Sequence, residues 1–167
     1  MPDAERPERA VLDLLDVPAA ERILAGTPAP GELWAADYPW ADELNALRFF
    51  LASGPRVPEA FGLYRIRRAS DGVAVGGIGF FGPPDDDGAV TLGYGLVPSA
   101  RGRGLATAAL TATLEIARAA GARRVQAVTD ADNVASQAVL LRCGFSLIRT
   151  DEQQHYFEHA LGTPKAP

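Results

Sequence analysis

A short stretch rich in arginine and glycine, LVPSARGRGLATAAL at residues 96–110, carries the clearest chemical signal in the sequence. It places Arg101 and Arg103 beside Gly102 and Gly104, directly before a run of helix-forming residues. Glycine has no Cβ, so an anion can approach the backbone closely, and the N–H groups that open a helix lack acceptors. The helix dipole and the two guanidinium groups also favour negative charge. The stretch therefore predicts a binding site for a pyrophosphate.

Two familiar phosphate-binding loops fit this stretch poorly. A Walker loop needs Gly-Lys followed by Ser or Thr, and the stretch contains no lysine. A dinucleotide fingerprint reads G-x-G-x-x-G; Gly102 and Gly104 match it, but the third position is Thr107. The strand expected before the loop also belongs to a hairpin meander and not to a βαβ unit. A glycine-rich turn with solvated arginines is the alternative that binds nothing.

The composition of the whole chain narrows the class of ligand. The chain has 167 residues, 47% of them hydrophobic, and a formal net charge of −5, which suits one domain spanning 1–167 with a buried core. The acidic balance argues against nucleic acid or an anionic membrane as a partner. Cys143 is the single cysteine, so no intrachain disulfide can form. With no apolar signal segment or membrane span in the sequence, we expect a cytoplasmic protein.

Hydrophobic periodicity predicts the elements that position the loop. Alternating apolar residues on both sides of Asp71-Gly72 indicate a three-stranded meander. After Pro98 the spacing becomes helical, and Gly121 is a natural end for that helix. The pattern predicts an α+β fold with a mixed sheet: strands at 9–17, 61–70, 73–82, 89–97 and 123–130, helices at 18–26, 41–53, 105–121 and 133–143, and two more strands within 145–161.

Two further motifs give the loop a family context. Residues 101–106, R-G-R-G-L-A, match the Arg/Gln-x-x-Gly-x-Gly/Ala pattern of the GNAT acyl-CoA N-acyltransferase superfamily, and Leu96-x-Pro98 precedes them as in that family. Further on, Asn133-x-x-Ser136 and then Gly144-Phe145 resemble the family's N-x-x-A/S motif followed by G-F. Residues 73–145 are therefore similar to this superfamily. The LGYGL sequence and Ser136 resemble the branch with ribosomal-protein N-terminal and antibiotic acetyltransferases.

The resemblance implies a GNAT-type fold, with a central, mostly antiparallel mixed sheet flanked by helices. The strands at 89–97 and 123–130 would splay apart, and acetyl-CoA would lie in the wedge as co-substrate, without a metal. Gly93 and Gly95 suit a bulge that opens the strand edge, or instead relieve packing there. Asn133 would bind the pantetheine arm and Ser136 would face it. The remaining coenzyme contacts implied are Leu96 and Val97 along the pantetheine, and Arg101, Gly102, Arg103, Gly104, Leu105, Ala106 and Thr107 around the pyrophosphate.

The reaction implied is direct attack of a primary amine on the acetyl thioester in a ternary complex. It needs a neutral amine, a donor for the developing oxyanion and a proton for the leaving thiolate. A backbone N–H near Leu96 would be the oxyanion donor. Many relatives carry a glutamate where this chain has Thr91, and a tyrosine where it has Leu140. Ser136 is the remaining candidate acid; its alternative is a helix serine bonded to the backbone.

The base is left open by the sequence among Asp37, Glu43, Glu152 and bulk water. The acceptor, a small molecule or a peptide N-terminus, is expected near the proline-rich segment 27–40. Trp34, Tyr38 and Trp40 with acidic neighbours suit a cationic amine, or instead anchor that segment on the core. An association of two copies is a further expectation.

Other reactive residues have simpler interpretations. We interpret Cys143 as a small core residue. His155 and His159 are expected on one face of a strand, without a third ligand for a metal. The pattern at Asp85–Asp87 indicates a solvated turn. Two competing functions stay open: a non-catalytic acyl-CoA-binding module, favoured by Thr91 and Leu140, and a protein that binds a nucleotide diphosphate through the same loop.

Overall fold

A seven-stranded sheet organises the computed structural model, which describes residues 6–54 and 58–162. The strand order is β1-β2-β3-β4-β5-β7-β6, and each neighbouring pair is antiparallel except β4 and β5, which are parallel. This arrangement confirms the expected α+β class with a mixed, mostly antiparallel sheet. The strands are β1 (Ala10–Leu14), β2 (Leu63–Arg68), β3 (Ala74–Phe80), β4 (Ala89–Leu96), β5 (Arg124–Asp130), β6 (Ser146–Thr150) and β7 (Gln154–Ala160).

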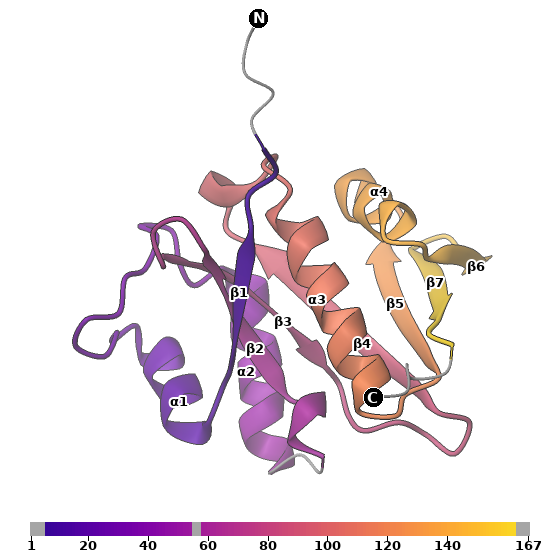
Figure 1. Ribbon diagram of the computed structural model, residues 1–167, viewed down its shortest axis with the longest axis horizontal. Helices are drawn as coiled ribbons and strands as arrows, with labels where there is room; N and C mark the ends of the chain where they lie inside the picture. The colour runs from indigo at the N-terminus through magenta and orange to yellow at the C-terminus, as the bar shows by residue number, and fades with distance from the viewer. Residues whose placement is uncertain (1–5, 55–57, 163–167) are drawn as a thin grey trace, which may run out of the picture.

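Helices cover both faces of the sheet. In Figure 1, α3 lies in front of the sheet and α2 behind it, with α1 beside α2 and α4 above β5. The buried positions of α3, among them Leu105, Ala109 and Leu110, recur at helical spacing and face the core. The helices are α1 (Val17–Ala25), α2 (Ala41–Ser53), α3 (Leu105–Ala119) and α4 (Val134–Arg142), with 3₁₀ turns η1 (Glu59–Phe61) and η2 (Pro98–Ala100).

The sequence patterns predicted these elements close to their observed bounds. Asp16 caps α1 by accepting a hydrogen bond from the Ala19 N–H at 2.8 Å, and Pro18 occupies the first turn. The turn at Asp71 connects β2 to β3, as the hairpin signal predicts. The predicted strand at 9–17 is too long, because its last residue, Val17, already belongs to α1.

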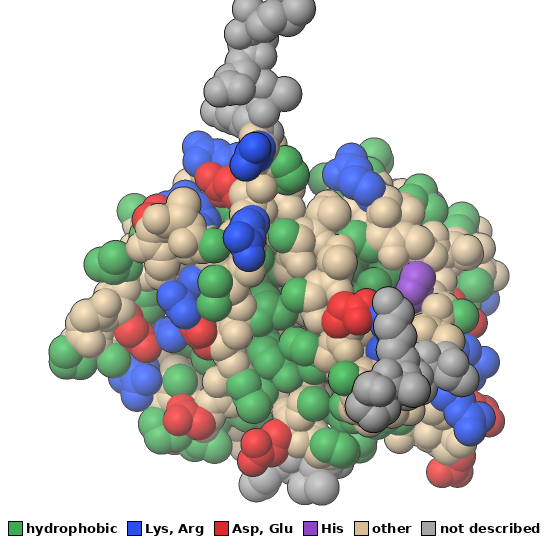
Figure 2. Space-filling model, in the orientation of Figure 1, with side chains coloured by type: hydrophobic (Ala, Val, Ile, Leu, Met, Phe, Trp, Pro, Cys, Tyr) green, Lys and Arg blue, Asp and Glu red, His purple; other side chains and the backbone are tan. Residues whose placement is uncertain are grey.

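Charged side chains of both signs are interspersed over the face seen in Figure 2, around hydrophobic side chains that lie between β1 and α3. Within residues 6–54 and 58–162, the apolar content and length of every helix fall short of what crossing a bilayer requires.

Pairing between β4 and β5 stops halfway along both strands. The last pair is Leu92 with Ala127, although β4 continues to Leu96 and β5 to Asp130. Beyond this point β4 follows β3 and β5 follows β7, so the twist of the sheet separates them (Figure 1). The predicted splay of these two strands is confirmed.

The bulge expected at Gly93 and Gly95 is wrong. The register between β3 and β4 runs without a shift from the Phe80–Leu92 pair to the Gly76–Leu96 pair. Gly93 serves close packing instead, since a Cβ there would lie 3.1 Å from the ring of Phe81, whereas a Cβ on Gly95 would meet no atom within 4 Å. The wedge therefore opens through loss of the β5 partner and not through an extra residue.

Candidate active site

Two left-handed glycines shape the loop between η2 and α3. Gly102 has φ +80° and Gly104 has φ +83°, a backbone region that residues other than glycine rarely adopt. Gly104 is the N-cap of α3, and no side chain caps this end. Within the described ranges, no oxygen accepts a hydrogen bond from the backbone N–H groups of residues 102–107. The loop thus presents a row of unpaired donors, which is what a diphosphate requires.

Both arginines of the loop have partners within the protein. The Nε of Arg101 donates to the Leu96 carbonyl at 3.1 Å, and its guanidinium carbon lies 5.6 Å from the ring centroid of Trp40. Arg103 pairs with the Glu8 carboxylate at 3.4 Å. Both side chains are exposed and each already has a partner in the protein, so binding a phosphate would compete with these contacts.

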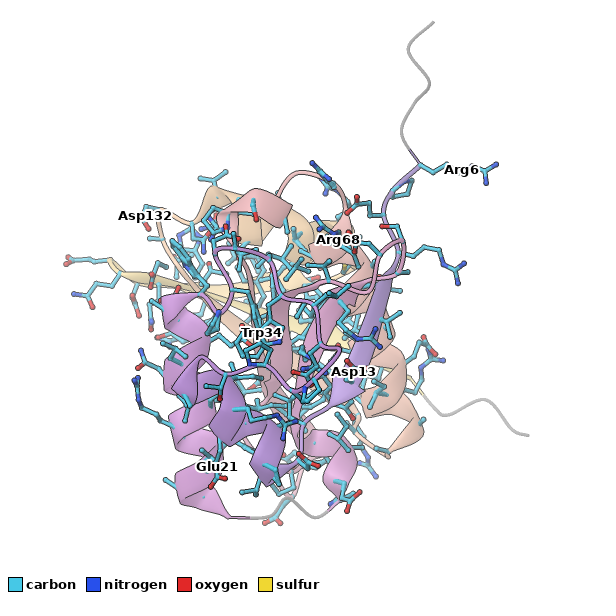
Figure 3. The ribbon with its side chains drawn as sticks, turned by 90° about the vertical axis from the view of Figure 1, so that its left-hand side faces the viewer. Arg6, Asp13, Glu21, Trp34, Arg68 and Asp132 are labelled. Carbon is cyan, nitrogen blue, oxygen red and sulfur yellow. The ribbon has the colours of Figure 1, made fainter. Side chains whose placement is uncertain are left out.

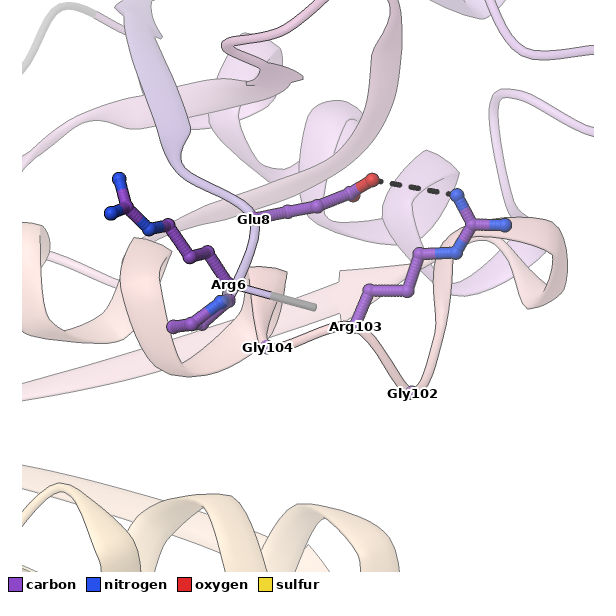
Figure 4. Close-up of a pocket in the computed structure, with 6 residues that line it drawn as sticks. Arg6, Glu8, Gly102, Arg103 and Gly104 are labelled. Carbon is purple, nitrogen blue, oxygen red and sulfur yellow. Dashed lines mark hydrogen bonds and ion pairs between the residues drawn. The ribbon is translucent and has the colours of Figure 1, made fainter. Parts of the chain in front are cut away.

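The N-terminal segment lies against the same loop. The Glu8 N–H donates to the Arg103 carbonyl at 3.0 Å, and a cavity is lined by Arg6, Pro7, Glu8 and three loop residues (Figure 4). Sequence reasoning missed this contact because its two sides are 95 residues apart. A carboxylate therefore stands beside the predicted anion site.

The open half of β4 directs its free backbone groups toward the wedge. The Val97 N–H donates to the Val75 carbonyl at 2.9 Å, so it is used within the sheet. Backbone direction alternates along a strand, and Leu96 accordingly faces the other way, where its carbonyl meets Arg101. Leu96 is the residue that presents backbone polar groups at the open edge.

Residues at the start of α4 border the other side of the wedge. The Asn133 side chain caps α4 by accepting a hydrogen bond from the Ser136 N–H at 3.2 Å. The Ser136 carbonyl accepts one from the Tyr94 hydroxyl at 3.1 Å, which links β4 to α4 across the wedge. Burial raises the pKa of Tyr94, which keeps its hydroxyl protonated. Sequence reasoning did not single out Tyr94; its place in LGYGL was the available signal.

Thr91 and Leu140, where the resemblance implies proton carriers, have structural surroundings here. Leu140 is fully buried in the core, and Thr91 lies on the paired half of β4, opposite Gln126 of β5. Neither supplies a titratable group to the wedge.

A second cavity, of about 220 Å³, lies between α2 and the sheet. Its floor is formed by glycines of β3 and β4, where the absence of side chains leaves room. Its walls are largely apolar and include Trp40, Leu47 and Phe81. Of the three aromatic residues predicted for an acceptor site, Trp40 lines this cavity.

The other two aromatic residues anchor the irregular segment. Trp34 and Tyr38 pack edge to face, with ring centroids 5.1 Å apart, and Tyr38 is buried in the core. The backbone of Trp34 also forms an isolated β-bridge with Ala74, the first residue of β3, and Figure 3 labels Trp34 near the centre of the view. The anchoring interpretation fits these two residues.

The three candidate bases have different surroundings. Asp37 accepts hydrogen bonds from the Ser99 hydroxyl at 2.6 Å and from the Ser99 N–H at 3.0 Å, and these bonds lower its pKa. Glu152 is exposed in the turn between β6 and β7. Glu43 lines the cavity beneath α2 and accepts a hydrogen bond from the Tyr38 hydroxyl at 3.0 Å. Burial raises the pKa of Glu43 to about 7.

The remaining reactive side chains lie outside this arrangement. The Nδ1 of His159 is 2.8 Å from the Gly144 carbonyl, and burial raises the pKa of Cys143, keeping it a thiol. Asp85 accepts hydrogen bonds from the N–H groups of Asp87 and Ala89, as a turn aspartate does. Across the described ranges, no three His, Cys, Asp or Glu side chains are grouped to hold a metal ion.

Comparison with known proteins identifies the family. Residues 11–146 match the family model described as an acetyltransferase (GNAT) domain. A search of curated proteins found no match.

Solved structures share the fold at low sequence identity. RimJ from Mycobacterium smegmatis, solved in complex with CoA-disulfide, is 20% identical, with a TM-score of 0.66 over 95% of this chain and 88% of that chain. A GNAT-family acetyltransferase from Bacillus anthracis is 15% identical, with a TM-score of 0.66 over 93% and 97% of the two chains. The protein yncA from Salmonella typhimurium, solved with acetyl-CoA, is 18% identical, with a TM-score of 0.62 over 95% and 97%.

Proposed function

The chain belongs to the GNAT acetyltransferase family, and on that premise we propose that it transfers the acetyl group of acetyl-CoA to a primary amine within a ternary complex. The amine belongs to a small molecule or to a peptide N-terminus. One observation carries the proposal: the unpaired N–H groups of residues 102–107 stand beside the half of β4 that has lost its β5 partner. A single domain spanning the chain performs the reaction.

The coenzyme fits these features as an extended ligand. Its diphosphate accepts from the N–H groups that open α3, with the hydroxyl of Thr107 nearby. Its pantetheine arm pairs with Leu96 at the open edge, because the N–H of Val97 is already bound within the sheet. Asn133 offers its amide NH₂ group, since its Oδ1 caps α4.

Coenzyme binding exchanges hydrogen bonds already present. Arg101 now donates to the Leu96 carbonyl, the group that a pantetheine amide would reach. Replacement by that amide releases the guanidinium, which is then available to the phosphates at the adjacent loop. Arg103 becomes available in the same way when it leaves Glu8. The arginines thus exchange protein acceptors for phosphate oxygens, which form stronger charge-assisted bonds with a guanidinium.

The chemistry follows from the position of the thioester at Leu96. The amine nitrogen bonds to the thioester carbonyl carbon and the C–S bond breaks, while the Leu96 N–H stabilises the oxyanion. An ammonium substrate gives up two protons, one to the leaving thiolate and one to solvent. Ser136, at the start of α4, is the proposed donor to the thiolate.

A non-catalytic acyl-CoA-binding module is the second candidate. The observation that favours it is the pair Thr91 and Leu140, which lack the proton carriers of many relatives. This function needs the same coenzyme site and no acceptor cavity.

Two measurements separate these functions. Calorimetric titration with acetyl-CoA, CoA and ATP should show binding of both CoA species and none of ATP; ATP binding without CoA binding would overturn the proposal. Thiol release from acetyl-CoA, measured over a panel of amines and peptides, should accelerate with an acceptor present. Tight acetyl-CoA binding with no acceleration by any acceptor would favour the module.

A further inference from the structure

We propose that Glu43 is the general base of the acetyl transfer, and that its cavity accepts a primary amine carrying an apolar group and no carboxylate beside the nitrogen. The proposal rests on the proposed function and assigns its acceptor half. Glu43 belongs to α2, a different element from the strand on which many relatives carry their base.

Glu43 lies over the part of the sheet where the thioester is expected. A Cβ on Gly77 would come within 2.8 Å of its Oε1, so the carboxylate rests directly on that glycine. Gly77 is the cross-strand partner of Gly95, which immediately precedes Leu96. Paired Cα atoms in such a sheet are about 5 Å apart. The carboxylate is therefore within one strand spacing of the open edge.

A gap in the side-chain layer connects that edge with the cavity. The position of a Cβ on Gly95 has no atom within 4 Å, and Gly95 lines the cavity together with Gly77. An amine held on the α2 side can reach through this gap toward Leu96. The glycines thus leave a passage between the two halves of the site.

The carboxylate of Glu43 lacks one of the hydrogen bonds that a buried group normally makes. Its Oε1 accepts from Tyr38, while its Oε2 is buried and has no partner within the described ranges. A buried carboxylate without a full set of donors binds a proton or attracts a cation. A substrate ammonium would supply the missing donor and the opposite charge. Tyr38 is a positioning residue, since it acts by orienting Glu43.

The charged and titratable groups around Glu43 favour its role as a general base. Tyr38 faces it from the irregular segment, Arg65 acts on it from β2, and Asp42 and Tyr64 share the cavity. Arg65 is itself paired with Glu32 at 2.9 Å and Asp13 at 3.3 Å, which leaves its charge largely compensated. Burial is the leading cause of the raised pKa of Glu43. Its value of about 7 suits a base that must release its proton again at neutral pH.

The lining of the cavity selects the substrate class. Its acidic lining residues are Asp42 and Glu43, and its lining includes no Lys or Arg, so a carboxylate beside the amine would meet two carboxyl groups and no lining residue to pair with. Trp40, Leu47 and Phe81 offer apolar surface for a substituent. The volume of about 220 Å³ lies below the roughly 300–1,000 Å³ of pockets for drug-sized ligands, which favours a slim group.

The proton balance of the step is simple. The ammonium gives one proton to ionised Glu43, and the neutral nitrogen then bonds to the thioester carbon as the C–S bond breaks. The thiolate takes up one of the two protons left on that nitrogen, relayed by the Ser136 hydroxyl, and protonated Glu43 returns its own to solvent. The products are an N-acetylated amine, CoA thiol and one released proton.

The first test replaces the base and leaves the coenzyme site intact. In Glu43→Gln we expect kcat to fall roughly 100- to 1,000-fold, with the Kd for CoA unchanged. With an alkoxyamine or arylamine, whose own pKa is low, the rate of the wild type should rise with pH around pH 7, and the variant should lose this rise. Glu21→Gln, a carboxylate change at an exposed position of α1, is the matched control and should behave as wild type.

The second test addresses the acceptor class. Paired substrates that differ by one carboxylate, phenethylamine with phenylalanine and isopentylamine with leucine, should show at least a tenfold preference in kcat/KM for the amine. Equal kcat/KM values within a pair would overturn the assigned class.

The outcomes separate this proposal from the proposed function. Absence of transfer to every acceptor in the wild type contradicts the acetyltransferase function itself. Transfer with full kcat and an unchanged pH profile in Glu43→Gln contradicts only the role of Glu43. If Glu43→Gln does not fold, Tyr38→Phe decides: it should displace the rise in rate with pH, and an unmoved profile overturns the proposal.

Discussion

The two halves of the proposed site are built by different means. The loop at the start of α3 consists of consecutive residues, and its donors are backbone N–H groups whose directions follow from two left-handed glycines. The cavity beneath α2 is assembled from α2, β3 and β4, and its chemistry depends on one buried carboxylate, Glu43.

This difference determines which amino-acid substitutions each half tolerates. A backbone site depends little on side-chain identity except where glycine conformation is required, so most substitutions in the loop remove at most one contact. A buried carboxylate depends on its neighbours for both position and charge. The loop should therefore fail at its glycines, and the cavity should fail at any residue that moves Glu43.

The largest effect is expected from Gly104→Val. The φ of +83° strains any side chain there, and a Cβ would lie 3.1 Å from Pro7, so the row of N–H donors would lose its shape. We expect CoA affinity to fall roughly 100-fold by calorimetry. Gly121→Val, at φ +95° and the other end of α3, imposes similar strain and should leave affinity unchanged. Equal CoA affinity of Gly104→Val and Gly121→Val would refute the role of the loop.

The pH dependence of folding stability should report on Glu43, in the cavity beneath α2. The pKa of Glu43 is raised from 4.5 to about 7, so the unfolded chain ionises this group first as pH rises. Its stabilising contribution is complete below pH 4.5, declines between pH 4.5 and 7, and is constant above. Glu43→Gln avoids that loss and should be more stable than wild type at pH 8 by about 3 kcal/mol, since a pKa difference of one corresponds to about 1.4 kcal/mol.

Denaturant unfolding of wild type and Glu43→Gln between pH 5 and 8 measures this difference. Glu152→Gln should follow the wild-type curve throughout. A stability gap that does not grow with pH would show that Glu43 titrates normally.

Gly77→Ala should disturb the cavity alone. Its Cβ would come within 2.9 Å of the Glu43 carboxyl carbon and displace that group, while the loop stays untouched. We expect kcat to fall roughly 10- to 100-fold at unchanged CoA affinity. Gly82→Ala, where a Cβ meets nothing within 4 Å, is the control. Loss of CoA affinity in Gly77→Ala would mean that the two halves are not separable.

The smallest effect is expected from Glu8→Gln. Removal of a carboxylate beside the loop releases Arg103, and at low salt CoA affinity should rise about two- to threefold, as exposed ion pairs are weak. Glu21→Gln on α1 removes a charge far from Arg6 and the loop (Figure 3) and should change nothing. A weaker affinity in Glu8→Gln would indicate that Glu8 supports the loop instead.

The sequence predicted most of the fold and the loop that we propose binds the coenzyme. Residue periodicity placed the meander, the long helix after Pro98 and the strand–helix alternation that follows, because these are local properties of the chain. The loop could be found for the same reason, since its glycines, arginines and helix start are adjacent. The expected bulge at Gly93 and Gly95 was wrong because glycine in a strand equally permits the close approach of Phe81.

Only the tertiary structure distinguished Glu43 from Asp37 and Glu152. In the sequence the three carboxylates cannot be told apart. The burial of Glu43, its hydrogen bond from Tyr38 and its contact with Gly77 arise only when α2 packs on the sheet. The same holds for Glu8, which reaches Arg103 across 95 positions. Backbone conformation is determined by neighbours along the chain, whereas the environment of a charged side chain depends on neighbours in space.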